Sequence, residues 1–139
     1  MARVPYPTRD AYPSAYLAAY DRMLRELAIM TVALVTGASY EFNHHWNSAL
    51  QAGVRREQLE QLADAQTSDA FEERERAIVR YAREATLSLK VSDETWSALR
   101  RHFSVRQTMD VVMAVAWYNA VARILLPMEI EMEDWYKRG

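Results

Sequence analysis

The stretch Gly37-Ala-Ser-Tyr-Glu-Phe-Asn-His-His45 lies between two segments with helical patterns, and it decides the fold. Before it, apolar residues recur at three- and four-residue steps from Tyr16 to Leu34, and nearly every residue from 28 to 35 is apolar. The glycine at its start ends this first helix, and Ser39 can cap a second helix that stops at Gly53. The stretch therefore predicts two consecutive helices, the first of them buried all round over residues 28–35.

The rest of the chain predicts further helices and no strands. Capping residues and apolar periodicity place them at about Arg55–Ala65, Phe71–Leu89, Ser92–His102 and Ser104–Leu125. Residues 1–13 contain three prolines and are expected to form an extended arm, and residues 128–139 form a tail in which Trp135 is a candidate interface anchor. Without an internal repeat or a linker, residues 1–139 are expected to form one all-α domain of about six helices.

The composition excludes several classes of function. A formal net charge of −2 gives no electrostatic case for a nucleic-acid partner. The chain begins without the apolar stretch of a signal peptide, and its longest apolar run, Val111–Tyr118, is too short to cross a bilayer. The absence of cysteine excludes disulfides, thiolate metal sites and thiol nucleophiles. We therefore expect a soluble cytoplasmic protein with no nucleic-acid or membrane partner.

Glu41 and His45 carry the most chemical information. They are four residues apart, so on a helix they share a face, whereas His44 lies about 100° round from His45. A carboxylate beside an imidazole can set the ring's tautomer and raise its pKa, which suits proton transfer near neutral pH. The same pair could instead be a helix-dipole glutamate and a partly buried histidine, and Glu26 could simply pair with Arg22 one turn earlier.

Several motifs in order resemble the carboxymuconolactone decarboxylase family, within the alkylhydroperoxidase-D-like (AhpD-like) superfamily. The similarity runs from about Leu24 to Leu126, and we identify it in the segments Arg25–Ile29, Leu34–Gly37, Phe42-x-x-His45, Ala49–Val54 and Asp69–Ala77. The resemblance implies an AhpD-like helical bundle that assembles as a homo-oligomer, a trimer or a hexamer. It also implies a longer N-terminal helical region than the one before Leu24 here.

The redox branch of that superfamily carries Cys-x-x-Cys-x-x-x-His with a glutamate twelve residues before the first cysteine. Laid on this chain, the two cysteines fall at Ala38 and Glu41, while Glu26, Tyr40 and His45 match the other positions. A thiol peroxidase needs its own thiolate, so the resemblance cannot extend to that activity.

The resemblance implies a decarboxylase or other lyase acting on a small unsaturated lactone or oxygenated carboxylic acid, with no cofactor. In this hypothesis His45 is the general acid or base, Glu41 or Glu26 orients it, and Tyr40 donates a hydrogen bond to the developing oxyanion. Two alternatives stay open. One is a catalytically silent structural or interaction member of the fold, and the other is a metal-dependent oxygenase or lyase that uses His45 with Glu41 or His44.

Overall fold

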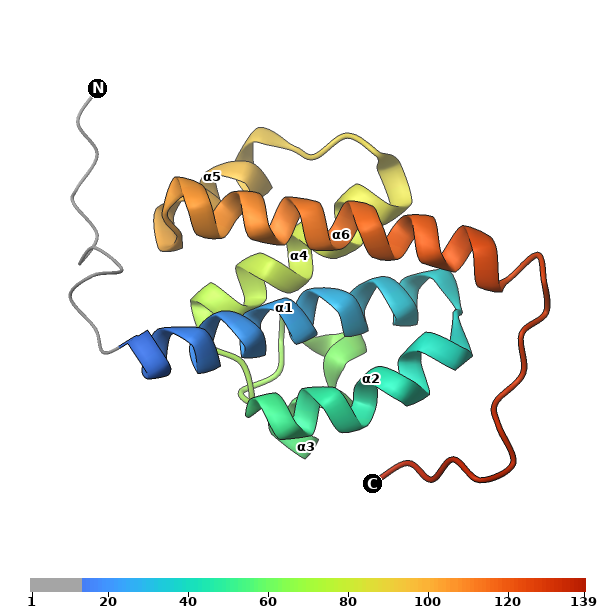
Figure 1. The fold of residues 1–139 in the computed structure, drawn as a ribbon. Helices are drawn as coiled ribbons and strands as arrows, with labels where there is room; N and C mark the ends of the chain where they lie inside the picture. The colour runs from blue at the N-terminus through green and yellow to red at the C-terminus, as the bar shows by residue number, and fades with distance from the viewer. Residues whose placement is uncertain (1–13) are drawn as a thin grey trace.

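The structure, a computed structural model, describes residues 14–139, and side chains from residue 21 onward. The expected arm, residues 1–13, and the side chains of Tyr16 and Tyr20 lie outside this part. The described residues form helices and no strand, which confirms the all-α prediction (Figure 1). The elements are α1 (Ser14–Thr36), α2 (Ser39–Ala52), α3 (Arg56–Glu60), the 3-10 helix η2 (Leu62–Asp64), α4 (Glu73–Ser88), α5 (Asp93–His102) and α6 (Val105–Leu125).

Helix α1 is the centre of the bundle. It packs against α2, α4 and α6, and Figure 1 shows it between α2 on one side and α6 on the other. Leu27, Ala28 and Met30 are completely buried because neighbouring helices cover them from different sides. The predicted all-round burial holds for residues 28–33 but not for Leu34, which is 36% exposed on the last turn, where the chain is about to reverse into α2.

The turn between α1 and α2 depends on Gly37, whose φ of 73° is a left-handed conformation that side chains disfavour. Gly53 ends α2 in the same region with a φ of 103°. Ser39 does not cap α2 as predicted: it is the first helical residue, and Ala38 stands at the N-cap without a side-chain hydrogen bond. The predicted capping box at Ser104 is confirmed, since the Gln107 backbone N–H donates to its hydroxyl.

The segment between α2 and α4 differs from the single helix predicted there. It breaks at Gln61 into α3 and η2, and α4 begins at Glu73, two residues later than expected. A buried polar contact joins these elements. The Gln58 side chain is 2% exposed and donates both to the Ala70 carbonyl and to Glu75 Oε2.

Helix α6 is long and apolar enough, by length and composition alone, to qualify as a membrane span within the described part of the chain. It packs along α1 and also touches α4, yet only 28% of its most apolar window is buried. After α6, the tail predicted for residues 128–139 turns back toward α2 (Figure 1). Near its end the Trp46 indole N–H donates to the Gly139 carbonyl, and Arg138 lies 4.2 Å above the Trp46 ring.

Candidate active site

Three of the four predicted site residues come together where α1 packs against α2. Glu26 lies on α1, and Glu41 and His45 lie one turn apart on α2. The Gly37 turn folds α2 back along α1, so residues 19 positions apart in sequence face each other. The Glu26 carboxylate therefore points at His45, and its ion pair is with that ring rather than with Arg22 as the alternative interpretation expected.

The His45 imidazole lies between the two carboxylates. Its Nδ1 is 2.8 Å from Glu26 Oε2, and its Nε2 is 3.1 Å from Glu41 Oε2. The three side chains are largely buried, with 18%, 11% and 14% of His45, Glu26 and Glu41 exposed. We call these three residues the His45 cluster.

The cluster holds a proton strongly. Burial by itself lowers the pKa of His45, but the hydrogen bond with Glu26, the close contact with Glu41 and the charges of both carboxylates outweigh it and raise the pKa from 6.5 to about 9. At neutral pH the ring is therefore an imidazolium that carries both protons. Its Nδ1–H donates to Glu26, and its Nε2–H faces Glu41.

The two contacts of the ring are not equivalent. The Glu26 contact satisfies the distance and angle of a hydrogen bond, whereas buried Glu41 Oε2 accepts no hydrogen bond from the described residues despite its 3.1 Å approach. Glu26 is therefore the orienting carboxylate in this conformation. The Nε2 side, with the less well aligned partner, is the side on which a ligand atom could replace Glu41.

All three cluster residues lie in a segment that matches a known family. A match to the carboxymuconolactone decarboxylase family covers residues 14–84. The chain belongs to the carboxymuconolactone decarboxylase family. A curated relative is the uncharacterized protein YdfG of Bacillus subtilis (strain 168), 26% identical over 110 residues that make up 78% of this chain and 75% of the relative.

Solved structures show the same fold. An Agrobacterium tumefaciens protein of unknown function, described as a candidate antioxidant defence protein AhpD, superposes with a TM-score of 0.75 over 94% of this chain and 99% of its own, at 17% identity. The debrominase Bmp8, in a C82A variant bound to 2,3,4-tribromopyrrole, superposes with a TM-score of 0.72 over 87% of this chain and 70% of its own, at 21% identity. These likenesses confirm the predicted AhpD-like fold.

The structure shows which residues occupy the two positions where the resemblance places cysteines. Ala38, where the resemblance places the first cysteine of the redox branch, is buried at the N-cap of α2. Glu41, at the place of the second, puts a carboxylate rather than a sulfur against His45 Nε2. The cluster thus pairs one imidazole with two carboxylates.

Tyr40, the fourth predicted site residue, donates its hydroxyl hydrogen bond to the tail and not to the His45 cluster. Its hydroxyl donates to Glu133 Oε1 of the tail at 2.7 Å, and this hydrogen bond raises the pKa of Tyr40. His44 reaches the other oxygen of Glu133 at 2.8 Å, with its ring between Tyr40 and Tyr136. Tyr40 and His44 therefore hold the tail in this structure, and no oxyanion role for Tyr40 follows from its position.

Tyr118, on α6, is a neighbour of the cluster that the predicted site did not include. Its ring meets the His45 ring edge-on at a centroid distance of 5.0 Å. Burial raises the pKa of Tyr118, and the charges of Arg25, Glu41 and Glu26 all act on it. Its position on the otherwise apolar run of α6 was the only signal in the sequence, and periodicity cannot tell such a residue from a core aromatic.

Asn119, one residue further along α6, cross-links helices. Its amide donates to the Thr86 hydroxyl on α4 and to the Val115 carbonyl.

For the metal-dependent alternative, no group of three or more His, Cys, Asp or Glu side chains is arranged to hold a metal ion among the described residues. His45 instead contacts one carboxylate on each of its two ring nitrogens, an arrangement suited to holding and transferring protons.

Proposed function

We propose that this chain is a cysteine-independent lyase of the carboxymuconolactone decarboxylase family that releases carbon dioxide from a small unsaturated lactone or oxygenated carboxylic acid. The observation that carries the proposal is the imidazole of His45 held between Glu26 and Glu41, with 2.8 and 3.1 Å contacts on its two nitrogens. Bmp8, which shares the fold, binds a small planar ring, and a lactone is a ligand of similar size.

The reaction needs a proton and a place for an electron pair. When the bond to the carboxylate carbon breaks, its electron pair moves into the conjugated carbonyl and gives an enolate. The Nε2 proton of His45 then passes to the enolate carbon, and neutral His45 regains a proton from water. A histidine with a pKa of about 9 is almost fully protonated at pH 7, so His45 already carries the proton that it donates when the substrate binds.

The carboxylates have different tasks in this scheme. Glu26 accepts the Nδ1–H hydrogen bond and fixes the ring plane, and the Tyr118 ring edge packs against the same imidazole. Glu41 leaves Nε2 when the substrate binds there, a movement favoured by its poor hydrogen-bond alignment. Both carboxylates stabilise the imidazolium, so the loss of either lowers the pKa of His45.

The test is turnover of carboxymuconolactone and a panel of related unsaturated lactones and β-keto acids, measured as carbon dioxide release. His45→Gln should lower kcat by about 10²- to 10⁴-fold, the usual contribution of a general acid. His102→Gln is the matched control, because His102 lies on α5 outside the cluster and should leave turnover unchanged. Activity that survives His45→Gln would contradict the assigned role, and no turnover of any panel member would contradict the lyase.

A catalytically silent member of the fold is the second candidate, and one observation favours it. A cavity of about 650 Å³ lies between α1 and α6, and none of the three cluster residues lines it. In a silent member the cluster would be a structural ion triad that joins α1 to α2. His45→Gln would then reduce stability, while wild-type protein of unchanged fold would turn over no member of the panel.

The homo-oligomer implied by the resemblance, a trimer or a hexamer, and the cytoplasmic location remain predictions. Several apolar side chains at the end of α6 and in the tail are exposed, among them Ile124 at 57%, Met128 at 63% and Trp135 at 73%. Apolar surface of this kind is typical of contacts with another chain.

A further inference from the structure

A second feature of the molecule is the cavity between α1 and α6, which the His45 cluster does not line. Its volume of about 650 Å³ is within the range of small-molecule sites. Leu24 and Phe103 form its apolar floor together with Val111 and Ala114, all of them buried. Charged side chains surround this floor, so the cavity combines an apolar base with ionic groups at its edge.

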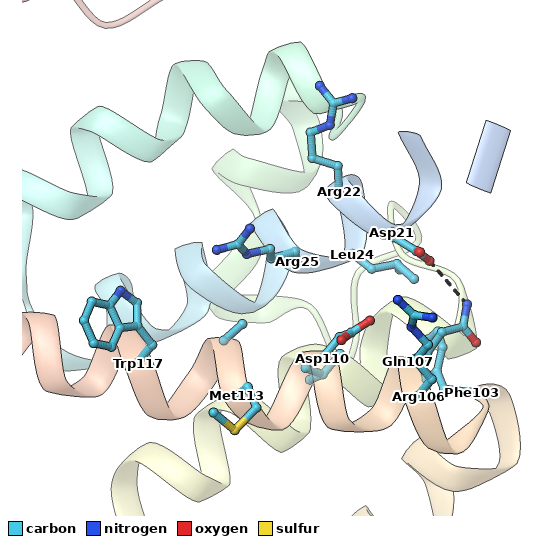
Figure 2. Close-up of a pocket in the computed structure, with 12 residues that line it drawn as sticks. Asp21, Arg22, Leu24, Arg25, Phe103, Arg106, Gln107, Asp110, Met113 and Trp117 are labelled. Carbon is cyan, nitrogen blue, oxygen red and sulfur yellow. Dashed lines mark hydrogen bonds between the residues drawn. The ribbon is translucent and has the colours of Figure 1, made fainter. Parts of the chain in front are cut away.

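The two ends of the cavity differ in charge. At one end Arg106 lies beside Asp110 and Gln107, and the Gln107 amide contacts Asp21, so positive and negative groups are mixed (Figure 2). At the other end Arg25 extends toward Trp117 with no carboxylate of the cavity lining drawn beside it (Figure 2). Arg22, the remaining arginine of the lining, points away from α6.

The Arg25 guanidinium has no carboxylate partner among the described side chains. It forms no ion pair or hydrogen bond with any side chain in the described part of the protein, although Glu26 follows it directly in sequence. Its charge nonetheless reaches α6, where it lowers the pKa of Tyr118 against the effect of burial. An arginine in this setting can form a bidentate pair with a carboxylate that comes from outside the chain.

Apolar surface adjoins the guanidinium. Trp117 is 63% exposed and Met113 is 62% exposed, one helical turn apart on α6 and both lining the cavity. A planar ring can stack on an indole, and a thioether adapts to an irregular ligand surface. One charged anchor beside two apolar walls matches a ligand with one anionic end and an apolar body.

From this geometry we propose that the cavity between α1 and α6, which we also call the groove, binds small aromatic carboxylates. Arg25 pairs with the carboxylate, and Trp117 and Met113 pack against the ring. This goes beyond the proposed lyase, because the groove contains none of the cluster residues and binding needs no proton transfer. The charge complementarity of Arg25 favours a carboxylate over a neutral ligand. The apolar walls favour an aromatic body over a simple inorganic anion.

The experiment compares 3-phenylpropionate with 3-phenylpropionamide, which has nearly the same shape and no charge. Calorimetry on the full chain should show that the acid binds at least about tenfold more tightly than the amide, as expected for one charge-assisted pair. Arg25→Gln should remove this preference by weakening the acid alone. Trp117→Leu should weaken both probes, because both lose the same stacking surface.

Matched variants separate binding in the groove from binding elsewhere on the chain. Arg83→Gln, an exposed arginine on α4 outside the cavity, should change neither affinity. His45→Gln should bind both probes normally, so failure of the lyase reaction and failure of this site are distinguishable. Equal affinities for acid and amide, an unchanged preference in Arg25→Gln, or no binding at millimolar probe would overturn the proposal. So would sedimentation showing that Trp117→Leu separates subunits, because the groove would then be filled by a second copy.

Discussion

Raising the pH through 9 should remove the proton that His45 holds between Glu26 and Glu41, and folding stability should fall with it. The pKa of His45 is raised in the folded chain, so its contribution to stability is complete below the unfolded value of 6.5. The contribution is lost as the pH rises through about 9. The perturbation is therefore alkaline pH, and the comparison is with His45→Gln, which has no proton to lose at this position.

The magnitude follows from the two pKa values. A difference between 6.5 unfolded and about 9 folded, at about 1.36 kcal/mol per pKa unit, gives roughly 3 kcal/mol in total. Most of it, on the order of 2.5 kcal/mol, is still present at pH 7 and is lost by pH 10. The His45 side chain is only 18% exposed, so solvent screening leaves most of this effect in place.

The assay is urea unfolding followed by circular dichroism, on wild type and His45→Gln at steps from pH 6 to pH 10. The stability difference between the two should shrink by about 2 to 3 kcal/mol over this range, while His102→Gln should follow the wild-type curve. A proton NMR titration should place the His45 midpoint near 9. A difference that stays flat from pH 7 to pH 10, together with a midpoint near 6.5, would refute the reasoning.

Three further predictions test other parts of the structure. Gln58→Leu should cost about 1–3 kcal/mol in urea unfolding, because the Ala70 carbonyl and the buried Glu75 carboxylate each lose one of their two hydrogen-bond donors; a cost near zero would contradict this. Glu133→Ala should speed amide exchange across residues 128–139, because it removes the contacts of Tyr40 and His44, whereas exposed Glu131→Ala should not; equal exchange in the two variants would show that the tail is held elsewhere. Sedimentation of the wild type should give three or six times the 16.1 kDa of one chain, and a monomer would contradict the assembly that the resemblance implies.

The helices were largely predictable because their signals are local. Ser104 and Gln107 are three residues apart and make a capping box in any chain that becomes helical there, and Gly37 and Gly53 act through their own backbone conformation. The wrong N-cap prediction at Ser39 arose because the residue type alone does not fix where a helix begins. A serine near a helix start is a good cap only if its backbone lies outside the helix, and here the turn at Gly37 places the N-cap one residue earlier.

The candidate site was predictable only in part, and the reason is the distance in sequence between its members. Glu41 and His45 follow from the helical repeat, but the approach of Glu26 to His45 requires α2 to fold back on α1, and it was anticipated only through the family resemblance. The contact of Tyr40 with Glu133 spans 93 positions and joins a helix to an irregular tail. No periodicity relates such residues, so the sequence could not predict this contact.

Glu41 lies where the resemblance places a cysteine, and a carboxylate at this position changes what the helix pair can do. A cysteine thiolate beside His45 would be a nucleophile, and its reactivity would depend on losing its proton to the ring. A carboxylate at that place gives up nucleophilic chemistry and instead stabilises the imidazolium, which helps to raise the pKa of His45 to about 9. Because the stored proton also contributes to folding, a substitution that tunes His45 toward faster proton release, such as Glu26→Gln, should lower stability at pH 7 as well. In this site, then, the proton affinity of His45 and the stability of the α1–α2 contact depend on the same two carboxylates.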